Sequence, residues 1–159
     1  LLSTIAADFI AKPLVERWRP SSDPLIKYAV DVVDDYRPGK YGFFSAHAAN
    51  TFSLALYFSL WVKNRLFSFA MISWSLLNCY SRIYLGAHYP SDVVVGLLVG
   101  AVIAVLFYLL SRKLFFKISS NFNYVSTQYS ATGYSVTDID MVLTVIGFLY
   151  ILIIIIPLL

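Results

Sequence analysis

The stretch PSDVVVGLLVGAVIAVLFYLL, residues 90–110, carries no charged side chain after Asp92 and is long enough to decide the fold class. A helix needs about 20 such residues to cross the hydrocarbon core of a bilayer. The whole chain has 59% hydrophobic and 13% charged residues and a mean hydropathy of +0.72. A soluble domain is about half apolar and a quarter charged. The sequence therefore predicts an integral membrane protein.

Further apolar segments flank this stretch, at residues 1–11, 43–62, 66–80 and 141–159. Because an open sheet edge has no hydrogen-bond partners in lipid, all five segments are predicted to be helices. The expected fold is an all-α, polytopic transmembrane bundle of about five helices, forming a single membrane-embedded domain over residues 1–159. Residues 1–11 are too few to span a bilayer, and no Met begins them, so we expect a truncated front end.

The small residues Gly96, Gly100 and Ala104 recur at every fourth position of residues 90–110. Small residues at this spacing form a stripe that lets the backbone of another helix approach closely. We interpret the stripe as a packing surface of the bundle rather than as part of a site.

The positive charges predict an orientation. Lys63 and Arg65 lie in a short connection between two apolar segments, and three further cations follow residues 90–110: Arg112, Lys113 and Lys117. The positive-inside rule places both regions in the cytoplasm. The polar segment 119–140 is then a cytoplasmic loop of unassigned role. Residues 12–42 and 81–91 face the periplasm or exterior, and the expected location is a bacterial inner membrane.

The unusual polar residues form three clusters on that outer side. The first is KPLVERWRP, residues 12–20, in which Lys12 and Arg19 are spaced by almost two helical turns and are expected to share one face. Pro20 is expected to end this helix at Arg19. Arg37, which also precedes a proline, competes as the anchor, but the nearest upstream lysine is about 80° away on a helix. We favour Lys12 and Arg19.

The second cluster is GFFSAHAAN, residues 42–50. Ser45 is predicted to be the N-cap of a helix, which leaves the N–H groups of Ala46, His47 and Ala48 pointing outward at its positive end. Such a helix start binds anions. His47 is placed to donate a proton to a group bound there.

The third cluster is SRIYLGAHYPSD, residues 81–92. Pro90 suits the first turn of a helix, so His88 precedes that helix and Asp92 lies within it. Four-residue spacing lets a carboxylate accept the imidazole N–H and leave the other ring nitrogen free as a nucleophile. Arg82 adds a planar donor fork suited to phosphate.

Each cluster alone has an ordinary structural explanation. Cations at helix ends extend to lipid headgroups, a histidine at a helix start is often interfacial, and a carboxylate in a first turn often acts as a cap. All three clusters, however, fall on one side of the predicted bundle. Three cations, a helix N-terminus and two histidines together match the needs of a phosphate dianion. No basic run with interleaved aromatic residues is present, so nucleic acid is not expected as a partner.

With these spacings the sequence resembles the type 2 phosphatidic acid phosphatase superfamily, whose motifs read K-x6-R-P, P-S-G-H and S-R-x5-H-x3-D. The first and third motifs match in every fixed position. The second departs twice, because Phe44 stands where the family usually has Pro and Ala46 where it usually has Gly. If only the N–H of that residue is needed, alanine serves as well as glycine.

The resemblance implies an integral-membrane lipid phosphatase without metal or cofactor. His88 would attack phosphorus and become phosphohistidine, with Asp92 orienting it, while His47 would protonate the leaving oxygen. The phosphoryl oxygens would be held by Lys12, Arg19, Ser45, Arg82 and the backbone N–H of Ala46. No cluster of carboxylates and histidines in the sequence is typical of a metal site.

An outward-facing site in a chain without a soluble domain favours a substrate whose tail stays in the bilayer. The resemblance brings in undecaprenyl diphosphate, phosphatidylglycerophosphate, phosphatidic acid and the phosphates of lipid A. Undecaprenyl diphosphate is the first expectation, since the expected fold is compact and of bacterial type. The pattern specifies no oligomeric state.

Three other classes fit parts of the pattern. Soluble vanadium haloperoxidases share the motifs, but five apolar segments argue against a soluble enzyme. A non-catalytic lipid-binding protein would explain Ala46 as decay of a site, but the other motif residues are intact. A transporter of phosphorylated lipids would need charged groups at mid-bilayer depth, and the clusters lie at helix ends.

Overall fold

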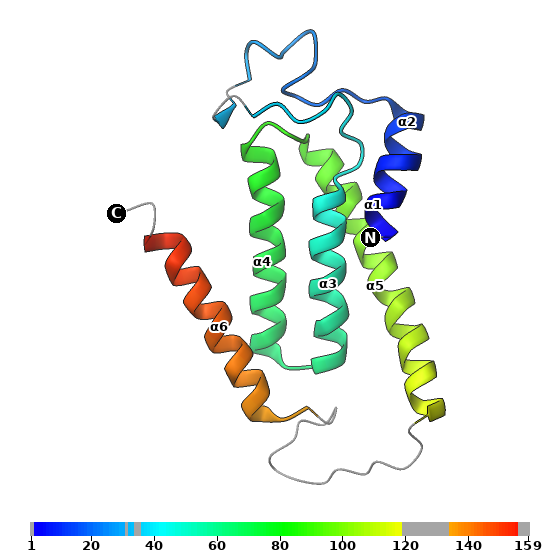
Figure 1. Cartoon of the computed structure of the whole chain (residues 1–159), viewed down its shortest axis with the longest axis vertical. Coiled ribbons are helices and arrows are strands. Elements are labelled where there is room, and N and C mark those ends of the chain that lie inside the picture. The colour runs from blue at the N-terminus through cyan, green and yellow to red at the C-terminus, as the bar shows by residue number, and fades with distance from the viewer. Residues whose placement is uncertain (1, 31, 34–35, 119–133, 156–159) are drawn as a thin grey trace.

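The computed structural model of the chain describes residues 2–30, 32–33, 36–118 and 134–155, and within them the regular structure is helical (Figure 1). A first helix runs without interruption through α1 (Leu2–Ile5), η1 (Ala6–Ala11) and α2 (Lys12–Val15). The others are α3 (Ala46–Val62), α4 (Arg65–Tyr84), α5 (Pro90–Ile118) and α6 (Val136–Ile155). The expectation of an all-α bundle of about five helices is confirmed.

Several helix ends differ from the predicted segments. Helix α4 extends to Tyr84 and α5 to Ile118, and α6 begins at Val136 rather than at Met141. Hydropathy marks the part of a helix that suits lipid, whereas helices end where a cap or turn ends them. The predicted loop 119–140 is thus shorter than expected. Its residues 119–133 lie outside the described residues.

The first helix contains a wide π-helical turn at η1, which ends where Lys12 donates its N–H to the carbonyl of Ala7. Pro13 follows immediately and has no N–H to donate. Wide turns of this kind absorb a local mismatch in the hydrogen-bond ladder of a helix. The helix therefore continues through the proline as far as Val15.

Helix α3 packs between α4 and α5, and its contact with α5 depends on glycine. A Cβ atom added at Gly96 would lie 2.6 Å from the carbonyl oxygen of Ser45, and one added at Gly100 would lie 2.6 Å from that of Ala49. Real Cβ atoms essentially never come this close to another heavy atom. Ala104, the third residue of the stripe, is 1% exposed. The prediction that this stripe is a packing surface is confirmed.

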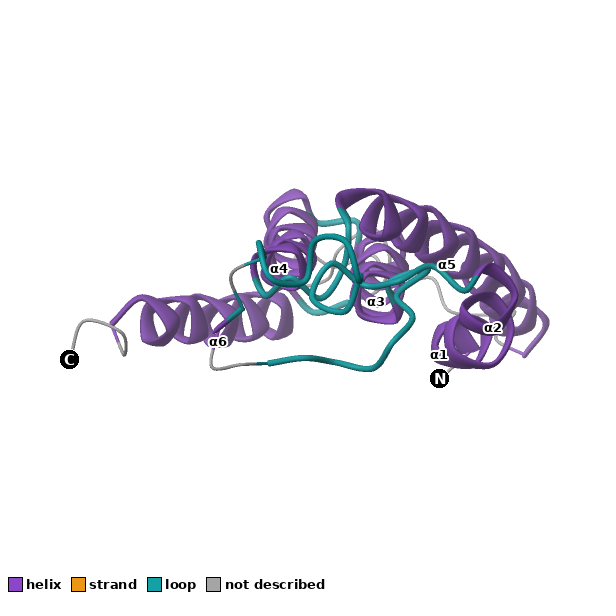
Figure 2. Ribbon diagram, turned by 90° about the horizontal axis from the view of Figure 1, so that it is seen from above, coloured by secondary structure: helices purple, strands orange, loops and turns teal. Residues whose placement is uncertain are grey.

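Two helices of the described chain are long and apolar enough to cross a bilayer, α5 over Pro90–Leu114 with a mean hydropathy of 2.9 and α6 over Val136–Ile153 with 2.0. Most of α6 stands away from the other helices (Figure 2). Its N-terminal part contacts α4 and the end of α3, where Ile139 is buried with Val62 and Phe67. Many of its large apolar side chains are exposed, as is expected of a helix surrounded by lipid.

The described residues between Val15 and Ala46, which are 16–30, 32–33 and 36–45 and are called the crossing segment below, lie over one end of the bundle (Figure 1). The α4–α5 turn and the start of α3 lie at this same end, so the three polar clusters meet there. The connection between α3 and α4, with Lys63 and Arg65, lies at the opposite end.

Candidate active site

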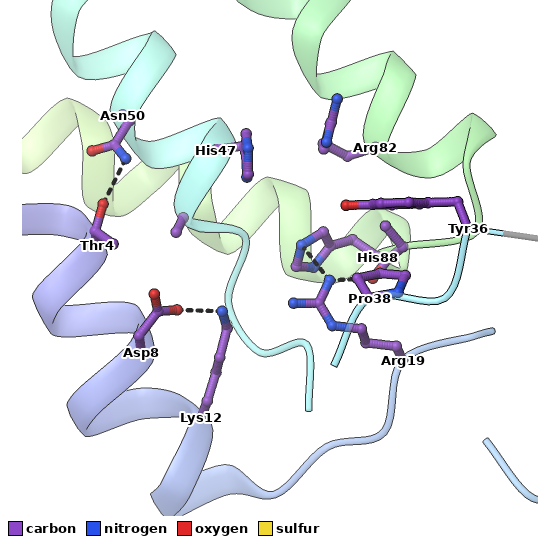
Figure 3. Close-up of a pocket in the computed structure, with 12 residues that line it drawn as sticks. Thr4, Asp8, Lys12, Arg19, Tyr36, Pro38, His47, Asn50, Arg82 and His88 are labelled. Atoms are coloured by element: carbon purple, nitrogen blue, oxygen red, sulfur yellow. Dashed lines mark hydrogen bonds and ion pairs between the residues drawn. The ribbon is translucent and has the colours of Figure 1, made fainter. Parts of the chain in front are cut away.

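A cavity of about 310 Å³ opens at the end of the bundle where the polar clusters meet (Figure 3). Its walls come from the first helix, the crossing segment, the start of α3 and the α4–α5 turn. The lining residues are Thr4, Asp8, Lys12, Arg19, Tyr36, Pro38, Ala46, His47, Asn50, Arg82, Ala87 and His88. Six of the eight predicted site residues therefore line one cavity, and Ser45 and Asp92 lie behind its wall.

His88 is held beside Arg82 by the turn that ends α4. The N–H groups of Ala87 and His88 both donate to the carbonyl oxygen of Arg82, at 3.1 and 3.3 Å. Gly86 adopts a positive φ of 62° at the tip of this turn, a conformation that glycine adopts without steric cost. The spacing between Arg82 and His88 thus corresponds to one closed turn at the helix end.

Arg19 reaches the cavity from an extended segment, so the prediction that Lys12 and Arg19 share a helical face is wrong. The helix ends at Val15, because Glu16 adopts the left-handed conformation with a φ of 47° and donates its N–H to the carbonyl of Lys12. Trp18 then pairs with Tyr41 in an isolated antiparallel bridge. The helix ends four residues before the position that Pro20 suggested, since the left-handed residue stops it first.

The Arg19 guanidinium is largely buried and contacts the predicted nucleophile. Its Nη1 lies 3.0 Å from the carbonyl oxygen of Ala87 and 3.2 Å from Nε2 of His88, and its Nε donates to the carbonyl oxygen of Tyr41. Because a guanidinium only donates hydrogen bonds, Nε2 is the acceptor. In the neutral ring the proton therefore lies on Nδ1, and the lone pair of Nε2 faces the cations of the cavity.

The expected hydrogen bond between His88 and Asp92 is not formed. The two atoms that would make it, Nδ1 of His88 and Oδ2 of Asp92, are 3.9 Å apart, beyond hydrogen-bond distance. Asp92 is fully buried, and its carboxylate instead accepts from Arg17 Nη1 at 2.9 Å and from the N–H of Tyr89 at 3.1 Å. The four-residue spacing brings the two side chains near each other, but the carboxylate accepts its hydrogen bonds from Arg17 and Tyr89 instead.

Burial favours the neutral form of His88. Removal from water lowers the pKa of this imidazole below its ordinary value, and the positive charge of Arg19 lowers it further. The Asp92 carboxylate opposes the shift without reversing it. A neutral imidazole keeps the lone pair that a nucleophile needs.

Helix α3 begins as predicted, with Ser45 as its N-cap. The Ser45 hydroxyl accepts a hydrogen bond from the N–H of Ala48 at 3.4 Å and is fully buried. Ser45 therefore stabilises the helix start rather than lining the cavity. Ala46 and His47 do line it, and N–H groups at these first helical positions have no partner within the helix.

Lys12 and Arg82 complete the ring of cations around the cavity. Lys12 forms an ion pair with Asp8, one turn earlier on the first helix. Arg82 donates from Nε to the Ser81 hydroxyl at 3.2 Å. The cavity thus presents three cationic side chains and one carboxylate, a net positive charge that favours an anion.

Sequence reasoning missed several lining residues and one neighbour. Asp8 and Thr4 come from the first helix and Tyr36 from the crossing segment, while Arg17 lies behind the wall on Asp92. Asn50 of α3 donates to Thr4 at 2.8 Å and also lines the cavity. The spacing of acidic and polar residues on the first helix, at positions 4, 8 and 12, was the available signal.

The alternative anchor Arg37 does not line the cavity. Its Nη1 donates to the carbonyl oxygen of Ser21 within the crossing segment. Among the residues that the structure describes, no three His, Cys, Asp or Glu side chains lie together as a metal site would require.

Comparison with known proteins identifies the family. The model of the PAP2 superfamily matches residues 1–116, which include all three motifs and the whole cavity. The chain belongs to the PAP2 superfamily. This is the superfamily of type 2 phosphatidic acid phosphatases that the motifs resemble, and its members are membrane helical proteins.

Relatives in the PAP2 superfamily act on lipid substrates. The chain is 40% identical over 111 residues to a lipid A 4'-phosphatase of Bacteroides thetaiotaomicron, covering 69% of this chain and 49% of the relative. It is 39% identical over 107 residues to a lipid A 4'-phosphatase of Porphyromonas gingivalis, covering 65% and 45%. It is 36% identical over 64 residues to the undecaprenyl-diphosphatase BcrC of Bacillus subtilis, covering 40% and 33%.

The chain thus spans about half the length of the lipid A 4'-phosphatases that it matches. No solved structure matches it.

Proposed function

We propose that this PAP2 protein is a membrane lipid phosphatase that uses His88 as its nucleophile. The observation that carries the proposal is the convergence, in one cavity, of His88, His47 and the three cations Lys12, Arg19 and Arg82. Phosphate ester hydrolysis is among the slowest uncatalysed reactions, so several preorganised donors and a nucleophile are needed together. This cavity offers both.

The proposed reaction has two steps. Nε2 of His88 attacks phosphorus, the bond from phosphorus to the leaving oxygen breaks, and His47 gives its proton to that oxygen. Water then attacks the phosphohistidine, His47 takes a proton from the water, and the bond between phosphorus and nitrogen breaks to release phosphate. The three cations and the N–H of Ala46 hold the phosphoryl oxygens throughout.

For the substrate, we favour a phosphate monoester on a lipid-linked sugar, as in lipid A, over undecaprenyl diphosphate. Two relatives that each match about two thirds of this chain are lipid A 4'-phosphatases. The cavity wall opposite His88 is also polar, formed by Thr4, Asp8 and Asn50 (Figure 3). Sugar hydroxyl and amide groups would find partners there, whereas the second phosphate of a diphosphate would meet the Asp8 carboxylate.

Undecaprenyl diphosphate remains the second candidate, supported by the match to the diphosphatase of Bacillus subtilis over a shorter segment. Phosphatidic acid and phosphatidylglycerophosphate are the other lipids to compare. We also propose that the site faces the periplasm or exterior of a bacterial inner membrane, because Lys63 and Arg65 lie at the opposite end of the bundle (Figure 1).

The test is phosphate release by the purified protein in detergent, with chelator present, from lipid A and the three other lipids. Release from lipid A at the highest kcat/KM supports the substrate assignment. Preferential release from undecaprenyl diphosphate would reverse the order of the two candidates. Absence of release from all four would contradict the phosphatase proposal and favour a lipid-binding role.

The rate is expected to depend on pH as a bell-shaped curve whose acid limb lies below about 6.5, the ordinary pKa of histidine. Burial lowers the pKa of His88, and only its neutral form attacks phosphorus. As the pH falls through that pKa, His88 gains a proton and the rate declines. The basic limb reports loss of the His47 proton. The measurement is kcat/KM across the range from about pH 4.5 to 9; a flat profile or an acid limb above the ordinary value would contradict this assignment.

Replacement Asp8→Asn tests the polar wall. We expect kcat/KM for lipid A to fall about tenfold, since a hydrogen bond to a charged group is worth about 1.5–3 kcal/mol, while kcat/KM for undecaprenyl diphosphate stays unchanged or rises. The same variant also frees Lys12 from its ion pair, but that effect acts on every substrate alike. The ratio of the kcat/KM values for lipid A and undecaprenyl diphosphate therefore reports the direct effect of Asp8 and not the effect of the freed Lys12. An unchanged ratio would exclude Asp8 from substrate selection.

A further inference from the structure

Arg17 does not line the cavity, but it forms a hydrogen bond with Asp92, which lies behind His88. Its Nη1 is 2.9 Å from Oδ1 of Asp92 and 2.9 Å from the hydroxyl of Ser91. Its guanidinium carbon lies 4.6 Å above the centre of the Tyr89 ring. One side chain thus contacts two residues in the first turn of α5, Ser91 and Asp92, and Tyr89, which precedes the helix.

The extended backbone of residues 17–19 explains why the side chains of Arg17 and Arg19 lie next to each other. In extended backbone, residues two apart point to the same side. The segment is fixed by hydrogen bonds from the N–H of Arg19 to the carbonyl of Lys40, at 3.1 Å, and from the N–H of Gly42 to the carbonyl of Arg17, at 2.9 Å. Arg19 therefore reaches His88 while Arg17 reaches Asp92.

The Asp92 carboxylate needs Arg17 because it is fully buried. A buried carboxylate without a partner is costly and attracts a proton or a cation. Its Oδ2 lies 3.9 Å from Nδ1 of His88, and this nitrogen has no hydrogen-bond partner among the described residues. Without Arg17, a protonated His88 would lie close enough to balance part of the Asp92 charge.

We propose that Arg17 is a positioning residue of the His88 site, which acts through Asp92 by balancing the carboxylate charge and holding it in place, so that His88 stays neutral. This inference rests on the function proposed above. Arg17 touches neither the cavity nor the reacting atoms, and the fixed positions of the first motif do not include it.

The other charged and titratable groups that line the cavity with His88 are unchanged by loss of Arg17. They come from the first helix, the crossing segment, α3 and α4, and are Asp8, Lys12, Arg19, Tyr36, His47 and Arg82. Three of them are cations, which oppose a positive charge on His88, and the Asp8 carboxylate is paired with Lys12. Arg17 thus acts on the protonation of His88 through Asp92. Among the described residues, Asp92 supplies the only carboxylate that the structure places against His88.

The direct test is an NMR titration of the histidine rings in Arg17→Gln. The sequence contains two histidines, so a His47→Gln variant assigns both signals. We expect Arg17→Gln to raise the pKa of His88 by about one pH unit, because the Asp92 charge then favours the protonated ring. Arg17→Lys should restore most of the original pKa, and Lys27→Gln, which removes a cation from the exposed crossing segment, should leave it unchanged. This readout needs no substrate, so it remains decisive if the phosphatase proposal fails.

The kinetic test uses a double-mutant cycle with Asp92→Asn. At neutral pH we expect Arg17→Gln to lower kcat by about ten- to a hundredfold, as small displacements in a catalytic site do, and to move the acid limb of kcat/KM upward. In the Asp92→Asn background the same change should have almost no effect. Equal losses in both backgrounds, or an unchanged pKa of His88 in Arg17→Gln, would overturn the proposal.

Discussion

Replacement of His88 by alanine is expected to lower kcat for lipid phosphate hydrolysis by about 10⁴-fold or more, as loss of a nucleophile does in enzymes that form a covalent intermediate. We expect no other side chain in the cavity to replace it, because Lys12, Arg19 and Arg82 are cationic and the Asp8 carboxylate is paired with Lys12. His47→Ala is expected to be milder, about 10²- to 10⁴-fold, since general acid–base catalysis contributes that much. The measurement is phosphate release under single-turnover conditions.

Labelling distinguishes a nucleophile from a residue that only binds phosphate. With substrate labelled on the phosphate and an alkaline quench that preserves phosphohistidine, we expect label on the wild type and on His47→Ala but none on His88→Ala. Ser73→Ala is the control, because Ser73 is bonded within α4 to the Phe69 carbonyl and lies far along the helix from the site. Label retained in His88→Ala, with the protein folded, would assign the covalent step to another residue.

The sequence was sufficient to predict the helical class and to name six of the residues that line the cavity. The motifs carry this information because each one lies where a helix begins or ends. His88 follows the turn that closes α4 and Ala46 begins α3, so local spacing determines their positions. The spacing of residues within a motif does not specify contacts between segments that are distant in the sequence. Predictions that depend on such contacts were less accurate.

Arg19 and Asp92 illustrate that limit. The distance between Lys12 and Arg19 along the sequence fits two helical turns, but a left-handed residue at Glu16 ends the helix between them. The spacing of His88 and Asp92 fits a hydrogen bond, but Arg17 takes the carboxylate from more than seventy positions away in the chain. Both outcomes depend on the pairing of residues 17–19 with residues 40–42, which has no local signature.

Replacement Gly96→Ala is expected to reduce both stability and phosphate release. At this glycine, α5 packs directly against the first turn of α3, which forms part of the cavity wall. A Cβ at Gly96 would lie 2.6 Å from the Ser45 carbonyl oxygen and 3.0 Å from the Cβ of Ala48. Over-packing of this kind costs about 1–3 kcal/mol when the backbone must move. The backbone that moves carries Ala46 and His47 into the cavity wall, and a displacement near 1 Å costs about a hundredfold in rate.

Two other glycines make the comparison specific. Gly100→Ala meets the Ala49 carbonyl at 2.6 Å, one turn deeper in the bundle, so it should destabilise the protein to a similar degree with a smaller loss of activity. Gly147→Ala in α6 meets nothing within 4 Å and should be neutral or slightly stabilising, since alanine favours a helix by up to about 1 kcal/mol. Thermal unfolding in detergent and kcat measured on the three variants would give this order. Equal activity in Gly96→Ala and Gly147→Ala would mean that α5 can withdraw from α3 without moving the helix start, and that the position of His47 does not depend on this contact.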